Sequence, residues 1–156
     1  MIEIIFVLIV LVIMAAGFMS RYVTTATNVL MIETDGLKTS LRYAQIKAMN
    51  DTVDTAPLGW GISPNSTSYT LVKSITTPTY LPGDKPLTHP GDTHTLATGV
   101  TVTVTAGGVT TVAFNEWGAP IDASGIPVTG NITLTLTKSG EAPANITVTK
   151  NTGFIQ

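Results

Sequence analysis

The feature that most constrains the fold is an uncharged, strongly apolar run at the start of the chain. It follows Glu3 and covers residues 4–20 without a charged residue or a proline. As an α-helix this run would be roughly 26 Å long, close to the ~30 Å hydrocarbon thickness of a bilayer. We therefore expect an apolar helix that can nearly span a membrane.

The helix is expected to continue past this run, but as an amphipathic helix with one apolar side. No proline precedes Pro57, so the helix can extend to about Asp51. Five small or aliphatic residues recur at spacings of three, four and seven, which places them on one side of a helix. They are Leu30, Leu37, Leu41, Ala44 and Ala48. That side is predicted to pack on the rest of the protein.

The remainder of the chain is typical of antiparallel β-structure. Residues 100–105 alternate valine with threonine, residues 106–108 supply a hairpin turn, and residues 109–114 return; residues 131–137 and 145–149 repeat the alternation. An earlier hairpin is expected from residues 58–63 and 68–73, followed by a long irregular loop over residues 74–95. The predicted fold is α+β, with the helix laid across one antiparallel sheet whose threonine face points outward.

Three parts of the chain are distinguished on this basis. Residues 1–23 form the apolar half of the helix, residues 24–52 its amphipathic half, and residues 53–156 a β-rich head domain.

Glu3 is the residue of the apolar segment that most needs an explanation. A carboxylate next to so apolar a run costs several kcal/mol if it enters hydrocarbon unpaired. In one interpretation it lies in the lipid headgroups, where a helix N-terminus favours negative charge. In the other it pairs with a positive group of a neighbouring copy, such as a free α-amine, when the apolar helices leave the bilayer and bundle. The residues alone leave both open.

The first fifty residues have a family resemblance. The run Glu-Ile-Ile-Phe-Val-Leu-Ile-Val-Leu-Val-Ile-Met-Ala, followed by a long amphipathic helix and a β-rich remainder, resembles the type IV pilin and type II secretion pseudopilin superfamily. Residues 37–48, 114–120 and 146–153 are similar to its minor-pseudopilin branch, which contains the H-type secretion subunit and fimbrial relatives. In the family the acidic residue is usually fifth in the mature protein, after a leader, whereas here it is third, so the mature N-terminus is left open.

The resemblance implies a structural subunit that waits in the inner membrane and polymerises into a helical filament of identical copies, at the cell surface or across the periplasm. It also implies processing by a prepilin peptidase and export by an assembly ATPase. The residues expected at the assembly contacts are Glu3, Ile4, Phe6, Leu8, Leu11 and Gly17. A long pilus and a short pseudopilus both remain possible, and we favour the main filament-forming subunit. The alternative is a monomeric, single-span membrane-anchored module whose residues 74–95 bind a ligand.

Composition excludes several other classes. A net charge of -2 with 12% charged residues gives no electrostatic basis for binding nucleic acid. The absence of cysteine excludes disulfides, thiolate metal sites and cysteine nucleophiles. We find no phosphate loop or dinucleotide fingerprint, and we expect neither enzymatic activity nor a cofactor. Asp84, His89, Asp92 and His94 match no strong metal-ligand spacing, so they are interpreted as solvated loop residues.

Trp60 and Trp117 are interpreted as domain core or subunit contacts. The threonine face could accept O-linked sugars, and Asn50, Asn65, Asn131 and Asn145 each begin an Asn-x-Ser/Thr sequon. We favour the simpler interpretation that threonine suits an exposed strand.

Overall fold

The computed structural model describes residues 2–51, 59–73, 77–79, 93–105 and 109–156, with the side chains of residues 2, 15–28, 77 and 78 left out. The chain forms one helix and nine strands within these residues, and every strand pair is antiparallel. The elements are α1 (Ile2–Asn50), β1 (Trp60–Asn65), β2 (Ser68–Lys73), β3 (Thr77–Thr79), β4 (Thr93–Thr95), β5 (Val100–Thr105), β6 (Val112–Phe114), β7 (Pro120–Ile121), β8 (Ile132–Lys138) and β9 (Ala144–Val148). The fold is α+β, as predicted.

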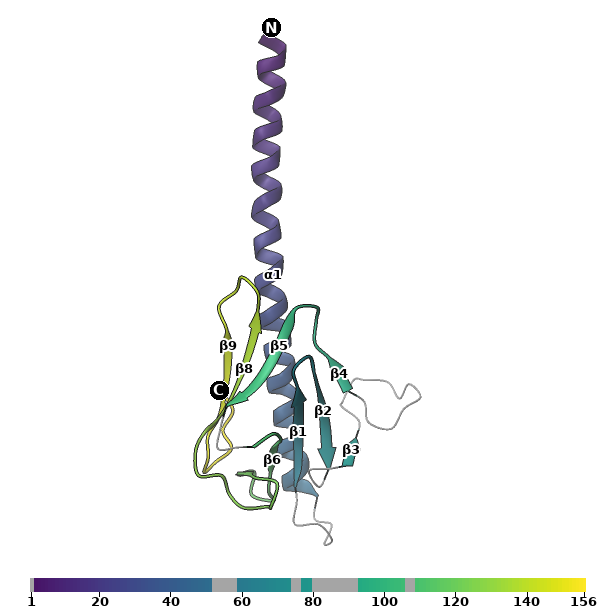
Figure 1. The fold of residues 1–156 in the computed structure, drawn as a ribbon, viewed down its shortest axis with the longest axis vertical. Helices are drawn as coiled ribbons and strands as arrows, with labels where there is room; N and C mark the ends of the chain where they lie inside the picture. Colours follow the sequence, from purple (N-terminus) through teal and green to yellow (C-terminus); the bar gives the residue numbers. More distant parts are fainter. Residues whose placement is uncertain (1, 52–58, 74–76, 80–92, 106–108) are drawn as a thin grey trace.

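Helix α1 has two environments along its length. Its C-terminal half lies against the strands, while its N-terminal half extends beyond them as a free rod (Figure 1). The helix ends where expected, with the Asp51 amide still donating to the Lys47 carbonyl at 2.9 Å. Lys47 lies in the last turn, where a positive charge interacts favourably with the helix dipole.

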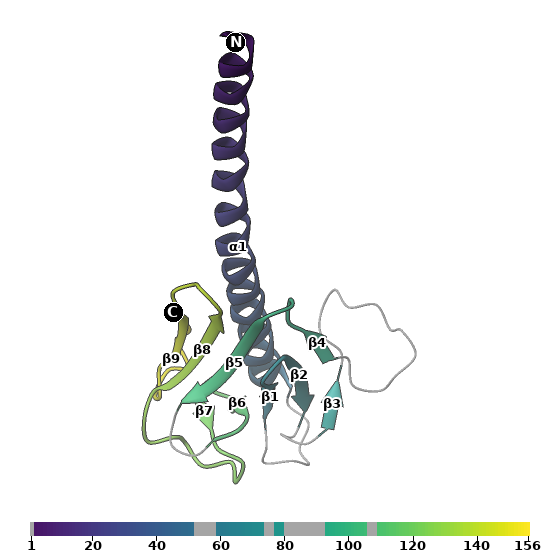
Figure 2. The ribbon, with the colours of Figure 1, turned by 45° about the horizontal axis from the view of Figure 1, so that its top comes forward.

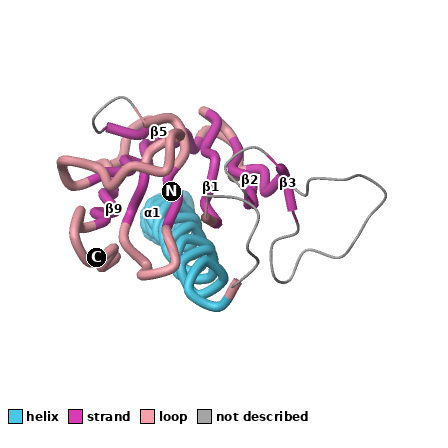
Figure 3. The backbone as a smooth tube through the Cα atoms, turned by 90° about the horizontal axis from the view of Figure 1, so that it is seen from below, coloured by secondary structure: helices cyan, strands magenta, loops and turns pink. Residues whose placement is uncertain are grey.

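The strands form two sheets, whereas the sequence predicted one. The larger has the order β3-β2-β1-β6-β7, with β4 also paired to β2, and the smaller has the order β5-β8-β9. Figure 2 shows the smaller sheet on one side of the C-terminal half of α1 and the β1–β4 strands on the other. Figure 3, which looks along the helix, shows that the strands of both sheets lie around one side of it and leave the other side uncovered.

The predicted hairpin of residues 100–105 and 109–114 is wrong. Strand β5 pairs with β8, while β6 pairs with β1 and β7 in the other sheet. Glycine in β1 explains part of this choice: a Cβ on Gly61 would meet the backbone of β6 at 2.6 Å from the Val112 carbonyl oxygen and 2.7 Å from the Ala113 Cα. The bare backbone of β1 therefore accepts β6 at a distance that a side chain would prevent.

The earlier hairpin forms with a shorter turn than predicted. Strands β1 and β2 pair from Trp60↔Lys73 to Asn65↔Ser68, so that Ser66 and Thr67 make the turn. The prediction of an irregular loop over residues 74–95 is wrong near both ends, because β3 and β4 form there and pair with β2. These short strands satisfy backbone groups along the edge of β2. The remaining residues of that loop lie outside the described part of the chain.

The core lies between the helix and the two sheets. The five stripe residues of α1, Leu30, Leu37, Leu41, Ala44 and Ala48, are only 0 to 4% exposed and share one cluster with apolar residues of both sheets. On the smaller sheet the apolar residues of β5 and β8 alternate with threonines on the outer face. Thr101 and Thr137 are opposite one another there, with their hydroxyls 2.8 Å apart. From here on, the head means the two sheets together with the C-terminal half of α1 that packs against them. The N-terminal half of the helix extends beyond the head, and we call it the free rod.

Candidate functional site

The candidate site is the free half of α1. Eleven consecutive large apolar residues, from Ile4 to Met14, are each 42 to 68% exposed. Eleven residues make about three helical turns, so apolar side chains cover every side of the rod. A helix that is apolar all round is normally buried in a membrane or in the core of a larger structure.

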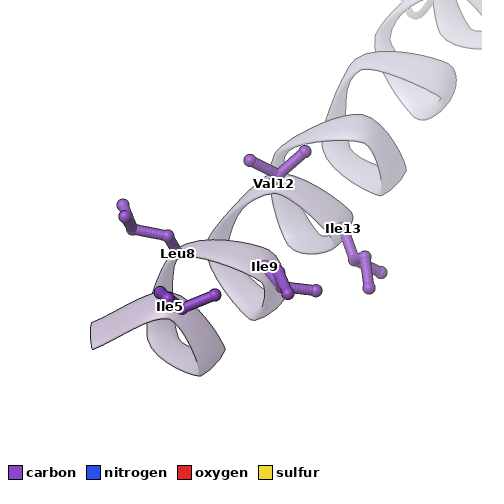
Figure 4. Close-up of a pocket in the computed structure, with 5 residues that line it drawn as sticks. All are labelled: Ile5, Leu8, Ile9, Val12 and Ile13. Carbon is purple, nitrogen blue, oxygen red and sulfur yellow. The ribbon is translucent and has the colours of Figure 1, made fainter. Parts of the chain in front are cut away.

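One side of this rod is grooved. Ile5, Leu8, Ile9, Val12 and Ile13 line a shallow surface depression, and all of them are aliphatic (Figure 4). Their spacings put them in two neighbouring rows on one side of the helix, Ile5-Ile9-Ile13 and Leu8-Val12, and the side chains of another helix can fit between these rows. Leu8, an expected assembly residue, belongs to the second row. Ile4, Phe6 and Leu11 are exposed elsewhere on the same segment.

Glu3 lies in the first turn of α1 and is exposed. Within the described residues it has no ion pair, so its carboxylate is accessible to another molecule. The side-chain environment at Gly17, the sixth expected assembly residue, lies outside the description. Among the residues described with their side chains, no helical segment is both long enough and apolar enough to cross a membrane.

The head-bound half of α1 makes polar contacts that the sequence did not reveal. Glu33, which has 13% of its side chain exposed, accepts a hydrogen bond from the Ala97 amide at 3.0 Å and lies 3.1 Å from His94 Nε2. The His94 ring lies 4.8 Å from the ring of Tyr69, centroid to centroid. Glu33 thus fastens α1 to β4 and to the segment that leads into β5.

His94 is one of the four residues that the sequence offers as weak candidates for metal ligands. The structure places it against Glu33 and Tyr69, while Asp84, His89 and Asp92 lie outside the described residues. Among the residues that are described, no group of three or more His, Cys, Asp or Glu side chains is placed to hold a metal ion.

A second polar cluster lies at the exit from the helix. Asp51 accepts a hydrogen bond from Trp60 Nε1 at 2.7 Å and pairs with Lys73 Nζ at 2.8 Å. The ammonium groups of Lys47 and Lys73 lie 5.7 and 5.4 Å from the Trp60 ring centroid, within range of cation–π attraction. Trp60 thus belongs to the joint between α1 and β1.

Trp117 has a different environment. It is 80% exposed, in the turn between β6 and β7, so it contributes little to the core. Of the two roles predicted for the tryptophans, a contact with another molecule suits Trp117 better. An exposed role could not be read from the sequence, because both tryptophans are flanked by glycine.

Comparison of the chain with protein-family models, with curated proteins and with solved structures found no match.

Proposed function

We propose that this chain is the repeating structural subunit of a helical filament, in which the apolar halves of many copies of α1 pack together in the interior. The main observation behind this proposal is the run of exposed apolar residues from Ile4 to Met14, on the half of α1 that extends beyond the head. So large an exposed apolar surface is normally covered by membrane or by protein.

The energy available from covering this surface is large. Full burial of one large aliphatic side chain contributes about 1.5–3 kcal/mol relative to exposure. Each of the eleven side chains retains about half or more of its surface. Burial in a bundle would therefore contribute on the order of 10–20 kcal/mol per subunit. This energy favours a membrane before assembly and a bundle of helices afterwards.

Glu3 supplies the register in this proposal. Apolar helices can slide along one another at little cost, whereas a carboxylate in an apolar bundle requires a positive partner. An α-amine of a neighbouring copy would meet that need at one axial offset only. The proposal agrees with the family resemblance, which also implies a prepilin peptidase, an assembly ATPase and a path from the inner membrane to the cell surface or through the periplasm.

The test is electron microscopy of the fraction sheared from producing cells, with mass spectrometry of its main polypeptide. We expect filaments composed of this chain. Glu3→Ala should abolish them, whereas Asp35→Ala, which removes an exposed carboxylate from the head-bound half of the same helix, should leave them intact. A chain that stays in detergent extracts as a monomer would refute the proposal and favour the membrane-anchored module.

A further inference from the structure

A small apolar surface lies at the end of the head farthest from the N-terminus of α1. Trp117 is 80% exposed, Phe154 61% and Met49 44%. The three come from distant parts of the chain, but their neighbours are close in space. Gly153, next to Phe154, approaches Gly118, next to Trp117, so closely that a Cβ on Gly153 would collide with the Gly118 carbonyl oxygen. A Cβ on Gly118 would in turn lie 3.1 Å from Met49 Sδ. We call these three residues the tip surface.

The turn that carries Trp117 is held in one conformation. Asn115 Oδ1 accepts hydrogen bonds from the Trp117 and Ala119 amides at 3.0 and 2.9 Å, and the Asn115 backbone bonds both Gly118 and Ala119. Such preorganisation reduces the entropy lost when an aromatic side chain enters an interface.

A single helix residue joins this turn to the one that carries Phe154. Gln45 Nε2 donates to the Gly118 carbonyl at 2.8 Å and to the Gly153 carbonyl at 3.1 Å. Gly118 and Gly153 both have positive φ, which suits glycine at these close approaches. The backbone turns that carry the two exposed aromatic residues are therefore held next to each other.

The size of the tip surface indicates what kind of contact it makes. An aromatic side chain buries about 150–250 Å², so the exposed parts of Trp117 and Phe154 offer roughly 300 Å² together. A stable complex between independent proteins needs about 800 Å² on each side. The tip surface is thus too small to hold a free partner, but it suffices as an added contact between molecules already joined elsewhere.

A second exposed apolar surface lies at the other end of the head. Met31 and Ile32 are exposed on α1 beside the buried Leu30, where the head begins. We call these two residues the shoulder surface. It lies about 25 Å along the helix from Met49, so the tip and shoulder of one molecule cannot touch each other.

We propose that the tip surface of one copy packs on the shoulder surface of the next copy in the filament. This inference rests on the proposed function and adds to it a contact between heads. Two different surfaces at opposite ends make a heterologous contact, which leaves an unused tip and an unused shoulder after each addition and can therefore propagate. A tip-to-tip contact would instead close a dimer.

Cross-linking in filaments tests this contact directly, because the chain contains no cysteine. Glu116→Cys and Asp35→Cys place thiols beside the tip and shoulder without altering either surface; both positions are exposed. With a short bifunctional thiol reagent, we expect the double variant to give a ladder of dimers, trimers and longer chains. Each single variant can give dimers at most. Thr103→Cys combined with Asp35→Cys, with a thiol on the outer face of the smaller sheet, should give no ladder.

Substitution in the tip surface provides a second readout. Trp117→Ala should raise the subunit concentration required for filaments at least tenfold without changing the unfolding temperature of the head, whereas Thr103→Ala should change neither. Filaments of the double-cysteine variant that yield no ladder, or Trp117→Ala filaments that form at the wild-type concentration, would overturn the contact alone. Absence of filaments from the wild type would remove the proposed function and this contact together.

Discussion

Two identical substitutions on the same helix separate its two roles. Leu41 is fully buried beneath the sheets and Leu11 is 59% exposed on the free rod. Leu41→Ala should destabilise the head by about 3–5 kcal/mol, the cost of removing a leucine from a packed core. At roughly 4 °C per kcal/mol for a domain of this size, the unfolding temperature should fall by about 12–20 °C. Leu11→Ala should change it by no more than about 2 °C, because exposed substitutions usually alter stability by less than about 0.5 kcal/mol.

Leu11→Ala, which hardly affects the stability of the head, should weaken filament assembly. Leu11→Ala removes three carbons worth about 0.8 kcal/mol each when buried, and 59% of that surface is open to a neighbour. The loss is therefore about 1.4 kcal/mol per subunit, or a tenfold rise in the concentration at which filaments form.

The two measurements are thermal unfolding followed by the fluorescence of the tryptophans in detergent, and sedimentation of filaments over a range of subunit concentrations. A fall in unfolding temperature for Leu11→Ala as large as that for Leu41→Ala would show that the rod and the head are not independent. An unchanged filament threshold for Leu11→Ala would refute burial of the rod during assembly.

Two further substitutions test the joints of the head. Glu33→Ala leaves the Ala97 amide without its acceptor and should cost about 1–3 kcal/mol; amide hydrogen exchange should quicken at Ala97, and unchanged exchange would contradict the fastening role. Gly61→Ala places a Cβ against the backbone of β6 and should destabilise the head by about 1–3 kcal/mol. Chemical denaturation would measure that loss. If the Gly61→Ala variant were as stable as the wild type, β1 and β6 would be able to move apart without cost, and the argument from close approach would be wrong.

The helix was the part of the fold most open to prediction from the sequence. Its length follows from the absence of proline before Pro57, and its buried side follows from a spacing that only a helix brings together. All five residues of that stripe, Leu30 to Ala48, are buried in the structure. The threonine alternation likewise predicted which side chains of β5 and β8 face outward.

The division into two sheets could not be predicted in the same way. Alternation shows which face of a strand is buried but does not show which strand lies beside it. Strand β6 is buried at all three of its positions and therefore lacks the alternation of β5. The Glu33 contacts were missed for a related reason, since they join residues more than sixty positions apart through a segment read as irregular loop.

The C-terminal end of the chain shows how the head closes without a disulfide. Thr147 and Gln156 exchange two backbone hydrogen bonds, Ile155 is buried, and Gln45 holds the Gly153 carbonyl. At about 1 kcal/mol for each hydrogen bond and about 2 kcal/mol for the isoleucine, these contacts are comparable to the 2–4 kcal/mol typical of a disulfide. They also differ from a disulfide in position, because the bond from Gln45 ties the C-terminal turn directly to α1. The residue that closes the head is thus the same one that fixes the tip surface, so weakening Gln45 would loosen the fold and the proposed contact between heads together.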